Sequence, residues 1–247
     1  MAFRYSLLGE VVSMAFETVR GSKMRSALTV LGVVIGITSI VGMTAIIRGF
    51  DQSLRDMIGA IGPDTILMLD ANNAWSDLPT ALRFVRRYEP YDPYWIEEPF
   101  SPDDIENHAR LAERTKVIVA TGEIEAGRWR FAELLRQRGA QILQTDACVC
   151  GGISEFRRIA ATADSFGVTL CPHWFHDLHA HLVAAIPNCR YVEYFPDDQV
   201  LNFRRLIDRQ LDTKDGNVVL PTGPGLGFDF DAKAIQRYAH EGWVETR

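Results

Sequence analysis

Short apolar runs recur through the middle of the chain, and an acid follows each of the first three. These acids are Asp70, Glu97 and Glu123, which lie 27 and 26 residues apart. That step is about the length of one strand, one helix and two loops. Because each such unit returns the chain to the same edge of a parallel sheet, we expect the three carboxylates to meet at its C-terminal rim. Converging carboxylates repel one another unless a hard cation lies between them, so the pattern predicts a Mg²⁺ site.

The same period continues through three further runs. They end at Asp146, His173 and Glu193, after steps of 23, 27 and 20 residues. Between the six expected strands, apolar residues recur at helical spacing. The expected helices cover residues 78–88, 105–114, 128–138, 153–166 and 176–186. The pattern therefore predicts an α/β fold whose parallel sheet carries a polar group at the end of each strand.

The pattern changes after residue 193. Asp215-Gly216 predicts a hairpin turn between residues 210–214 and 217–220. Residues 232–240 predict a final helix. This part of the chain therefore leaves the alternation of strand and helix.

Residues 62–242 resemble the C-terminal barrel domain of the enolase superfamily, in its mandelate racemase/muconate lactonizing subgroup. The motifs that carry the resemblance are Leu69-Asp70-Ala71-Asn72, Trp95-Ile96-Glu97-Glu98-Pro99, Gly122-Glu123, Gln144-Thr145-Asp146, Gly151-Gly152-Ile153, Pro172-His173 and Pro224-Gly225-Leu226-Gly227. The resemblance implies a partial TIM-type (β/α) barrel, which lacks its first two βα units and the capping domain. It also implies a cytoplasmic parent family whose members are often homo-oligomeric.

The resemblance assigns a role to each rim residue. Asp70, Glu97 and Glu123 correspond to Mg²⁺ ligands, and His173 with Asp146 corresponds to the general acid/base pair. Glu193 corresponds to a group that hydrogen-bonds a substrate carboxylate oxygen, and Asn72 to a substrate contact. The chemistry is removal of a proton next to a carboxylate, for which Mg²⁺ stabilises the developing negative charge. A histidine suits the base because its pKa lies near neutrality.

One family motif has no counterpart in this chain. The complete family carries a Lys-x-Lys motif on its second strand, but the four lysines here are Lys23, Lys116, Lys214 and Lys233. With one base, dehydration of a sugar acid is favoured as the reaction, and racemisation is the alternative. The substrate is a sugar acid or another small carboxylate. Because the lid and the second base lack counterparts, we expect the chain as written to show no dehydratase activity.

The chain also contains an uncharged run of 22 residues, from Ser26 to Ile47. Its length predicts a transmembrane helix, and Gly32 with Gly36 would allow close helix packing. A cleavable signal peptide and a buried helix of a soluble protein are the alternatives. Basic residues before the run favour a cytoplasmic N-terminus, and residues 3–19 are typical of an amphipathic surface helix.

Residues 1–66 resemble the start of macrolide-exporter-type ABC transporter permeases, on the segments 20–29 and 31–36. We therefore interpret the chain as a fusion: a permease-like segment at 1–61 and the incomplete barrel domain at 62–247. A two-domain membrane enzyme that evolved as such is one alternative. A permease fragment with a passenger C-terminal domain is another.

Charge and cysteine spacing exclude further classes. The net charge of −6 and the lack of a basic stripe exclude nucleic acid as a partner. The four cysteines form no Cys-x-x-Cys pair, which favours reduced thiols over a disulfide or zinc site. His173, His176, His179 and His181 suggest a zinc site as an alternative, although their spacing is loose.

Overall fold

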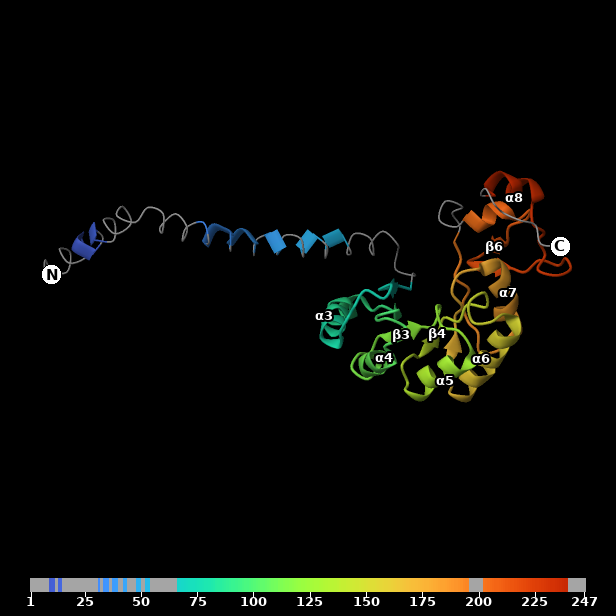
Figure 1. The fold of residues 1–247 in the computed structure, drawn as a ribbon, viewed down its shortest axis with the longest axis horizontal. Helices are drawn as coiled ribbons and strands as arrows, with labels where there is room; N and C mark the ends of the chain where they lie inside the picture. The colour runs from blue at the N-terminus through green and yellow to red at the C-terminus, as the bar shows by residue number, and fades with distance from the viewer. Residues whose placement is uncertain are drawn as a thin grey trace. The chain divides into compact units, whose positions relative to one another are not determined.

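The fold is given by a computed structural model of the 247-residue chain, shown in Figure 1. It describes residues 66–195 and 202–239. Before them it describes only short helical pieces, at 9–11, 13–14, 31, 33–35, 37–39, 42–43, 48–49 and 52–53. The chain divides into two units, Met1–Thr65 and Ile66–Arg247, which are considered separately. The domain limits expected from the sequence, 1–61 and 62–247, stay a prediction.

The described residues of the first unit are all helical. Within the described part of the chain, no helix is both long enough and apolar enough to cross a membrane. Most of the run from Ser26 to Ile47 lies outside the described residues, as does most of the predicted amphipathic segment at 3–19. The structure therefore gives the predicted transmembrane helix no support.

The second unit is built on a five-stranded parallel sheet in which the strands follow sequence order. The strands are β1 (Met68–Asp70), β2 (Trp95–Glu97), β3 (Ile118–Thr121), β4 (Ile142–Leu143) and β5 (Thr169–Leu170). The predicted α/β fold with a parallel sheet is confirmed. The expected sixth strand is wrong, because an isolated parallel bridge between Leu170 and Cys189 is the only pairing that the described residues form there.

Five helices alternate with the strands: α3 (Leu78–Tyr88), α4 (Ile105–Ala112), α5 (Arg128–Arg136), α6 (Ile153–Ser165) and α7 (His176–Ala185). A short 3₁₀ helix, η1 (Glu89–Tyr91), follows α3. Two helices begin at aspartate caps: Asp77 accepts a hydrogen bond from the backbone N–H of Thr80, and Asp104 from that of Asn107. Such caps satisfy backbone donors that the first helical turn leaves free. The helices therefore begin where the sequence predicts.

The core lies between these helices and the sheet (Figure 1). Phe131, Leu143 and Phe156 are fully buried in one cluster, which joins α5 and α6 to β4. Phe100 and Leu111 are fully buried in another, which joins α3 and α4 to β2 and β3. Burial of these side chains packs the helices against the sheet, and this packing fixes the positions of the strand ends relative to one another.

The C-terminal tail contains η2 (Asn202–Leu206), the antiparallel pair β6 (Asp212–Lys214) and β7 (Asn217–Val219), and α8 (Ala232–Tyr238). Asp215 and Gly216 form the turn with φ angles of 50° and 73°, which suit aspartate and glycine. The predicted hairpin and final helix are confirmed. An isolated antiparallel bridge between Ile207 and Phe230 ties the tail together.

Candidate metal centre and acid–base pair

The first two predicted metal ligands are neighbours in the sheet. Asp70 ends β1, Glu97 ends β2, and the two are paired directly in the parallel register. Both line a cavity of about 400 Å³, together with Glu193. Asp70 is exposed, whereas Glu97 is buried. Parallel pairing has therefore placed two carboxylates side by side, with a third on the wall of the same cavity.

Glu97 is held in a polar but poorly solvated position. Its Oε2 accepts a hydrogen bond of 3.1 Å from the indole N–H of Trp95. Burial raises the pKa of Glu97 to about 8, and the charges of Asp70, Glu193 and Glu123 add to this increase. Glu97 is therefore costly to ionise beside the other acids. A divalent cation bound there would stabilise its ionised form.

Glu123 follows β3 after a glycine that the local geometry requires. Gly122 has a φ of 120°, and a Cβ there would lie 2.9 Å from Cε1 of Phe131. Burial raises the pKa of Glu123, and the side chains of Glu97 and Glu123 are hydrogen-bonded. We call Asp70, Glu97 and Glu123 the carboxylate cluster.

The carboxylate cluster is not a closed ligand shell as it stands. Among the residues that the structure describes, no group of three His, Cys, Asp or Glu side chains is arranged to hold a metal ion. The donors are nevertheless the oxygen atoms that Mg²⁺ prefers, and burial together with the neighbouring acids makes Glu97 costly to ionise without a cation. The residues present therefore fit Mg²⁺ in their chemistry, and their role as ligands stays a prediction.

The predicted acid–base pair lies beside this cluster. Nδ1 of His173 is 3.1 Å from Oδ2 of Asp146, whose other oxygen accepts a hydrogen bond from the backbone N–H of Cys148. Nε2 of His173 is 3.7 Å from Oε1 of Glu123. One ring nitrogen is thus held by a buried aspartate, and the other faces the carboxylate cluster.

The charges around this pair favour a protonated histidine. Burial alone would lower the pKa of His173, but the hydrogen bond to Asp146 and the charge of Glu123 raise it above its usual value. Burial would raise the pKa of Asp146, but its hydrogen bonds with His173 and Cys148 lower it. Asp146 therefore stays ionised and stabilises the imidazolium.

The backbone at this rim adopts left-handed conformations that side-chain-bearing residues seldom take. They occur at Asn72 and Asn73 after β1, at Glu98 after β2, and at Trp174 and Phe175 after β5, with φ between 38° and 59°. Such conformations persist only where surrounding contacts hold them, and they cluster at functional sites. The asparagines after β1 favour this conformation locally, whereas the strand ends at Glu98 and at Trp174 and Phe175 depend on tertiary contacts.

Glu193 and Asn72 make contacts within the protein that the sequence did not predict. The backbone N–H of Trp174 donates a hydrogen bond of 2.5 Å to Oε2 of Glu193. The backbone N–H of Asn72 donates one of 2.7 Å to Oδ1 of Asp70. Glu193 thus holds the loop after His173, and Asn72 orients a predicted metal ligand. Their roles as substrate contacts stay predictions.

His179 is a buried residue that holds two loops of this site together, and the sequence indicated it only as part of a loose zinc pattern. It is fully buried on α7. Its Nε2 accepts a hydrogen bond of 2.9 Å from the backbone N–H of Ala147, and its Nδ1 lies 2.7 Å from the backbone oxygen of Trp174, to which it donates. It therefore links the loop after Asp146 to the loop after His173 as a neutral ring. The sequence signal was a histidine on the inward face of a helix.

The other sites suggested by histidine and cysteine spacing are not assembled. His176 is buried, and within the described part of the chain neither of its ring nitrogens has a hydrogen-bond partner. Nε2 of His181 pairs with the backbone oxygen of Leu226. All four cysteines are free thiols. Zinc ligation by these histidines is therefore not supported.

Comparison with known proteins gives the family. Residues 52–234 match the model of the family described as enolase C-terminal domain-like. The chain belongs to this family, within the enolase superfamily. It is 37% identical over 175 residues to L-talarate/galactarate dehydratase of Salmonella typhimurium, covering 71% of this chain and 42% of that protein. It is 31% identical over 194 residues to arabinonate dehydratase of Saccharolobus solfataricus, covering 76% of this chain and 51% of that protein.

Solved structures agree with this family membership. L-Talarate dehydratase from Polaromonas sp. JS666, complexed with Mg and L-glucarate, matches with a TM-score of 0.69 at 36% identity, over 76% of this chain and 51% of that one. A racemase from Streptomyces coelicolor A3(2) with bound magnesium matches with a TM-score of 0.68 at 29% identity, over 75% and 51%. The chain thus spans about half the length of these relatives. The comparisons give no support to the resemblance of residues 1–66 to transporter permeases.

Replacing His179 by Ala should destabilise the second unit by about 2–4 kcal/mol. The change leaves the N–H of Ala147 and the carbonyl of Trp174 unpaired and opens a cavity at a buried position. Chemical denaturation measures the loss. His181→Ala is the control, since that half-buried ring makes one backbone contact. Equal losses in the two variants would contradict the linking role of His179.

Replacing Glu97 by Gln should change how stability depends on pH in buffer without divalent cations. The pKa of Glu97 rises from 4.5 to about 8 on folding. Between these values the unfolded chain has lost the proton that the folded chain retains, so rising pH lowers the free energy of unfolding. The variant removes this loss, so its stability relative to the parent should increase from about pH 5 to about pH 8. A difference independent of pH would count against the burial of Glu97.

Proposed function

We propose that residues 66–239 carry the site of a Mg²⁺-dependent enzyme that removes a proton next to a carboxylate, as in the dehydration of sugar acids. The observation that carries this proposal is the orientation of His173. Asp146 holds one ring nitrogen at 3.1 Å, and the other lies 3.7 Å from Glu123 of the carboxylate cluster. A base beside a cluster of metal-type ligands is the arrangement this reaction needs.

Each residue then has a chemical task. Asp70, Glu97 and Glu123 would hold the metal ion, which supplies positive charge against the negative charge that develops on the substrate carboxylate. Nε2 of His173, in the neutral form that a bound Mg²⁺ nearby would favour, would accept the proton from the substrate carbon. Asp146 keeps the opposite nitrogen as the N–H donor and stabilises the imidazolium after transfer. Glu193 and Asn72 lie at the same rim and are candidate substrate contacts.

The substrate class rests on the relatives. The dehydratases of Salmonella typhimurium and Saccharolobus solfataricus are named for talarate, galactarate and arabinonate. The Polaromonas structure holds L-glucarate. We therefore propose a sugar acid, with oxygen groups on neighbouring carbons, as the substrate. Membrane attachment through residues 26–47 forms no part of this proposal.

Racemisation is the second candidate, because the Streptomyces coelicolor structure is that of a racemase. It requires a base on each face of the reacting carbon. Lys116 comes before β3, at the end opposite the rim, whereas Lys214 lies on β6 and Lys233 on α8. None of these three described lysines is placed as the partner of His173, so dehydration is the better supported reaction.

Magnesium should stabilise the folded chain, because a ligand that binds the folded state alone shifts the unfolding equilibrium. At about 100 times the dissociation constant the gain is about 2.7 kcal/mol. Glu97→Gln should lose most of it. Glu106→Gln should keep it, since Glu106 is an exposed acid on α4. A folded parent protein whose thermal unfolding is unchanged by Mg²⁺ would refute the proposed metal site.

Proton abstraction is tested by exchange of the substrate α-proton in deuterated water, followed by NMR with galactarate, L-talarate and arabinonate. We expect Mg²⁺-dependent exchange that the His173→Asn variant lacks. We expect no 2-keto product above that variant, because Asp70 is exposed and no described lysine is placed to assist loss of hydroxide. Exchange equal in parent and variant would refute the role of His173, and product from the parent alone would show that the inactivity prediction is wrong.

A further inference from the structure

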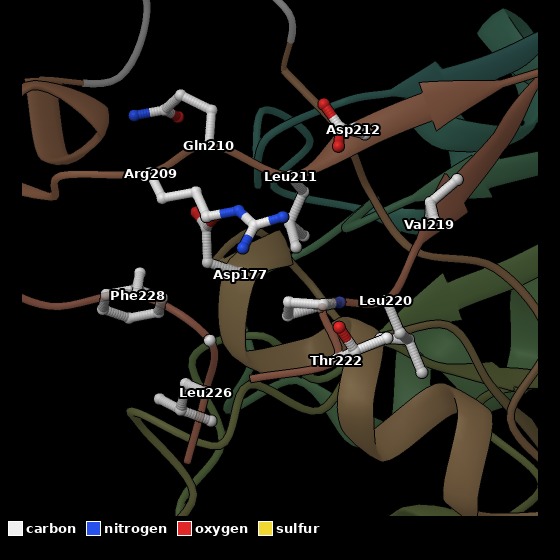
Figure 2. Close-up of a pocket in the computed structure, with 12 residues that line it drawn as sticks. Asp177, Arg209, Gln210, Leu211, Asp212, Val219, Leu220, Thr222, Leu226 and Phe228 are labelled. Carbon is white, nitrogen blue, oxygen red and sulfur yellow. The ribbon is translucent and has the colours of Figure 1, made fainter. Parts of the chain in front are cut away.

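A second cavity lies between the start of α7 and the C-terminal tail, as Figure 2 shows. Its volume is about 160 Å³. It is walled by Asp177 of α7, by residues 209–212 leading into β6, and by residues from 219 to 228 after the hairpin. None of these residues belongs to the carboxylate cluster or to the acid–base pair. The reaction proposed above therefore leaves this cavity unexplained.

Asp177 is the buried polar group of this cavity. The residue is 1% exposed, and within the described part of the chain its Oδ1 has no hydrogen-bond partner. Its Oδ2 is 3.4 Å from Nε2 of His176, but burial lowers the pKa of that histidine to about 4, so the ring is neutral near pH 7. A buried carboxylate oxygen without a partner destabilises the fold, and a donor entering the cavity would recover that loss.

The nearby Arg204 is already committed to other groups. Its Nε donates a hydrogen bond of 2.6 Å to Oε1 of Gln210, and one terminal nitrogen donates one of 2.9 Å to the backbone oxygen of Phe195. Its guanidinium also lies over the ring of Tyr194. Burial raises the pKa of Asp177 above its usual value, and the charge of Arg204 offsets part of this increase.

The rest of the wall supplies an opposite charge and apolar surface. Arg209 is exposed, and its guanidinium pairs with no described residue. Figure 2 shows the side chains of Asp177, Arg209 and Thr222 around the same space. The apolar part of the wall comprises Leu211, Val219, Leu220, Leu226 and Phe228. The wall thus carries two acids, buried Asp177 and exposed Asp212, and one arginine, so it suits a ligand that presents a donor group to Asp177 and an anionic group to Arg209.

We propose that this cavity binds a compact carboxylate with an amino or hydroxyl group on the neighbouring carbon and a short apolar side chain. The amino or hydroxyl group donates to Asp177, and the carboxylate pairs with Arg209. The apolar group contacts the leucines and Phe228. A cavity of about 160 Å³ is smaller than the pockets that take drug-sized ligands, so it selects molecules of amino-acid size.

Isothermal titration calorimetry on the full chain tests this with four probes of one shape. L-Valine and L-2-hydroxyisovalerate carry both polar groups, isovalerate lacks the donor, and isobutylamine lacks the carboxylate. We expect binding of at least one of the first two and of neither control. Binding of L-valine alone identifies an amino acid site, and binding of the hydroxy acid alone identifies a hydroxy acid site. Heat from neither, or isovalerate binding as tightly as either, would overturn the proposal.

Matched variants locate the binding. Asp177→Asn should weaken binding of an amino acid about tenfold or more, because its ammonium loses a charged partner. Arg209→Gln and Thr222→Val, which remove a cation and a hydroxyl group from the cavity wall, should weaken binding of either probe. Asp215→Asn in the hairpin turn and Arg205→Gln on η2 are exposed controls that should bind as the parent does. Circular dichroism checks folding. If Asp177→Asn is unfolded, unchanged affinity in the other two cavity variants would still overturn the proposal.

Discussion

Because β1 to β5 are parallel, the chain leaves each strand at the C-terminal end of the sheet. The helix that follows returns it to the N-terminal end, where the next strand begins. The acids and the histidine that follow the strands are consequently brought to a single rim. Burial, with the repulsion between neighbouring acids added to it, raises the pKa of Glu97 to about 8. The hydrogen bond to Asp146 and the charge of Glu123 raise the pKa of His173. The order of the strands therefore brings these side chains together, and a cation would stabilise their carboxylates in the ionised form.

The rim is also held by contacts that cross between loops. Glu193 fixes the N–H of Trp174, and His179 ties the carbonyl of that residue to the N–H of Ala147. These contacts stabilise the left-handed backbone at Trp174 and Phe175. Because Ala147 directly follows Asp146 and Trp174 directly follows His173, the same contacts set the distance between the two members of the acid–base pair.

The three predicted metal ligands are buried unequally. Glu97 lies on β2, between two other strands, whereas Asp70 ends β1, which pairs on one side only within the described sheet. The buried carboxylate is costly to ionise, and the exposed one is well solvated, so they contribute differently to metal binding. A further buried acid, Asp177 of α7, lies outside this cluster and faces a separate cavity beside the C-terminal tail.

The sequence by itself determined the alternation of strand and helix, the parallel sheet, the hairpin at Asp215-Gly216 and the polar residues at or shortly after the ends of the five strands. Those features follow from local periodicity and turn chemistry, which a single sequence displays directly. Only the tertiary structure decided that the run before Glu193 forms no strand, that His179 joins two loops, and that the carboxylates do not close into a ligand shell. These outcomes depend on where side chains point and on which distant backbone groups they meet, which no local pattern records. The same applies to the long apolar run at 26–47. Its composition is compatible with a transmembrane helix, but composition does not record the environment that surrounds a segment.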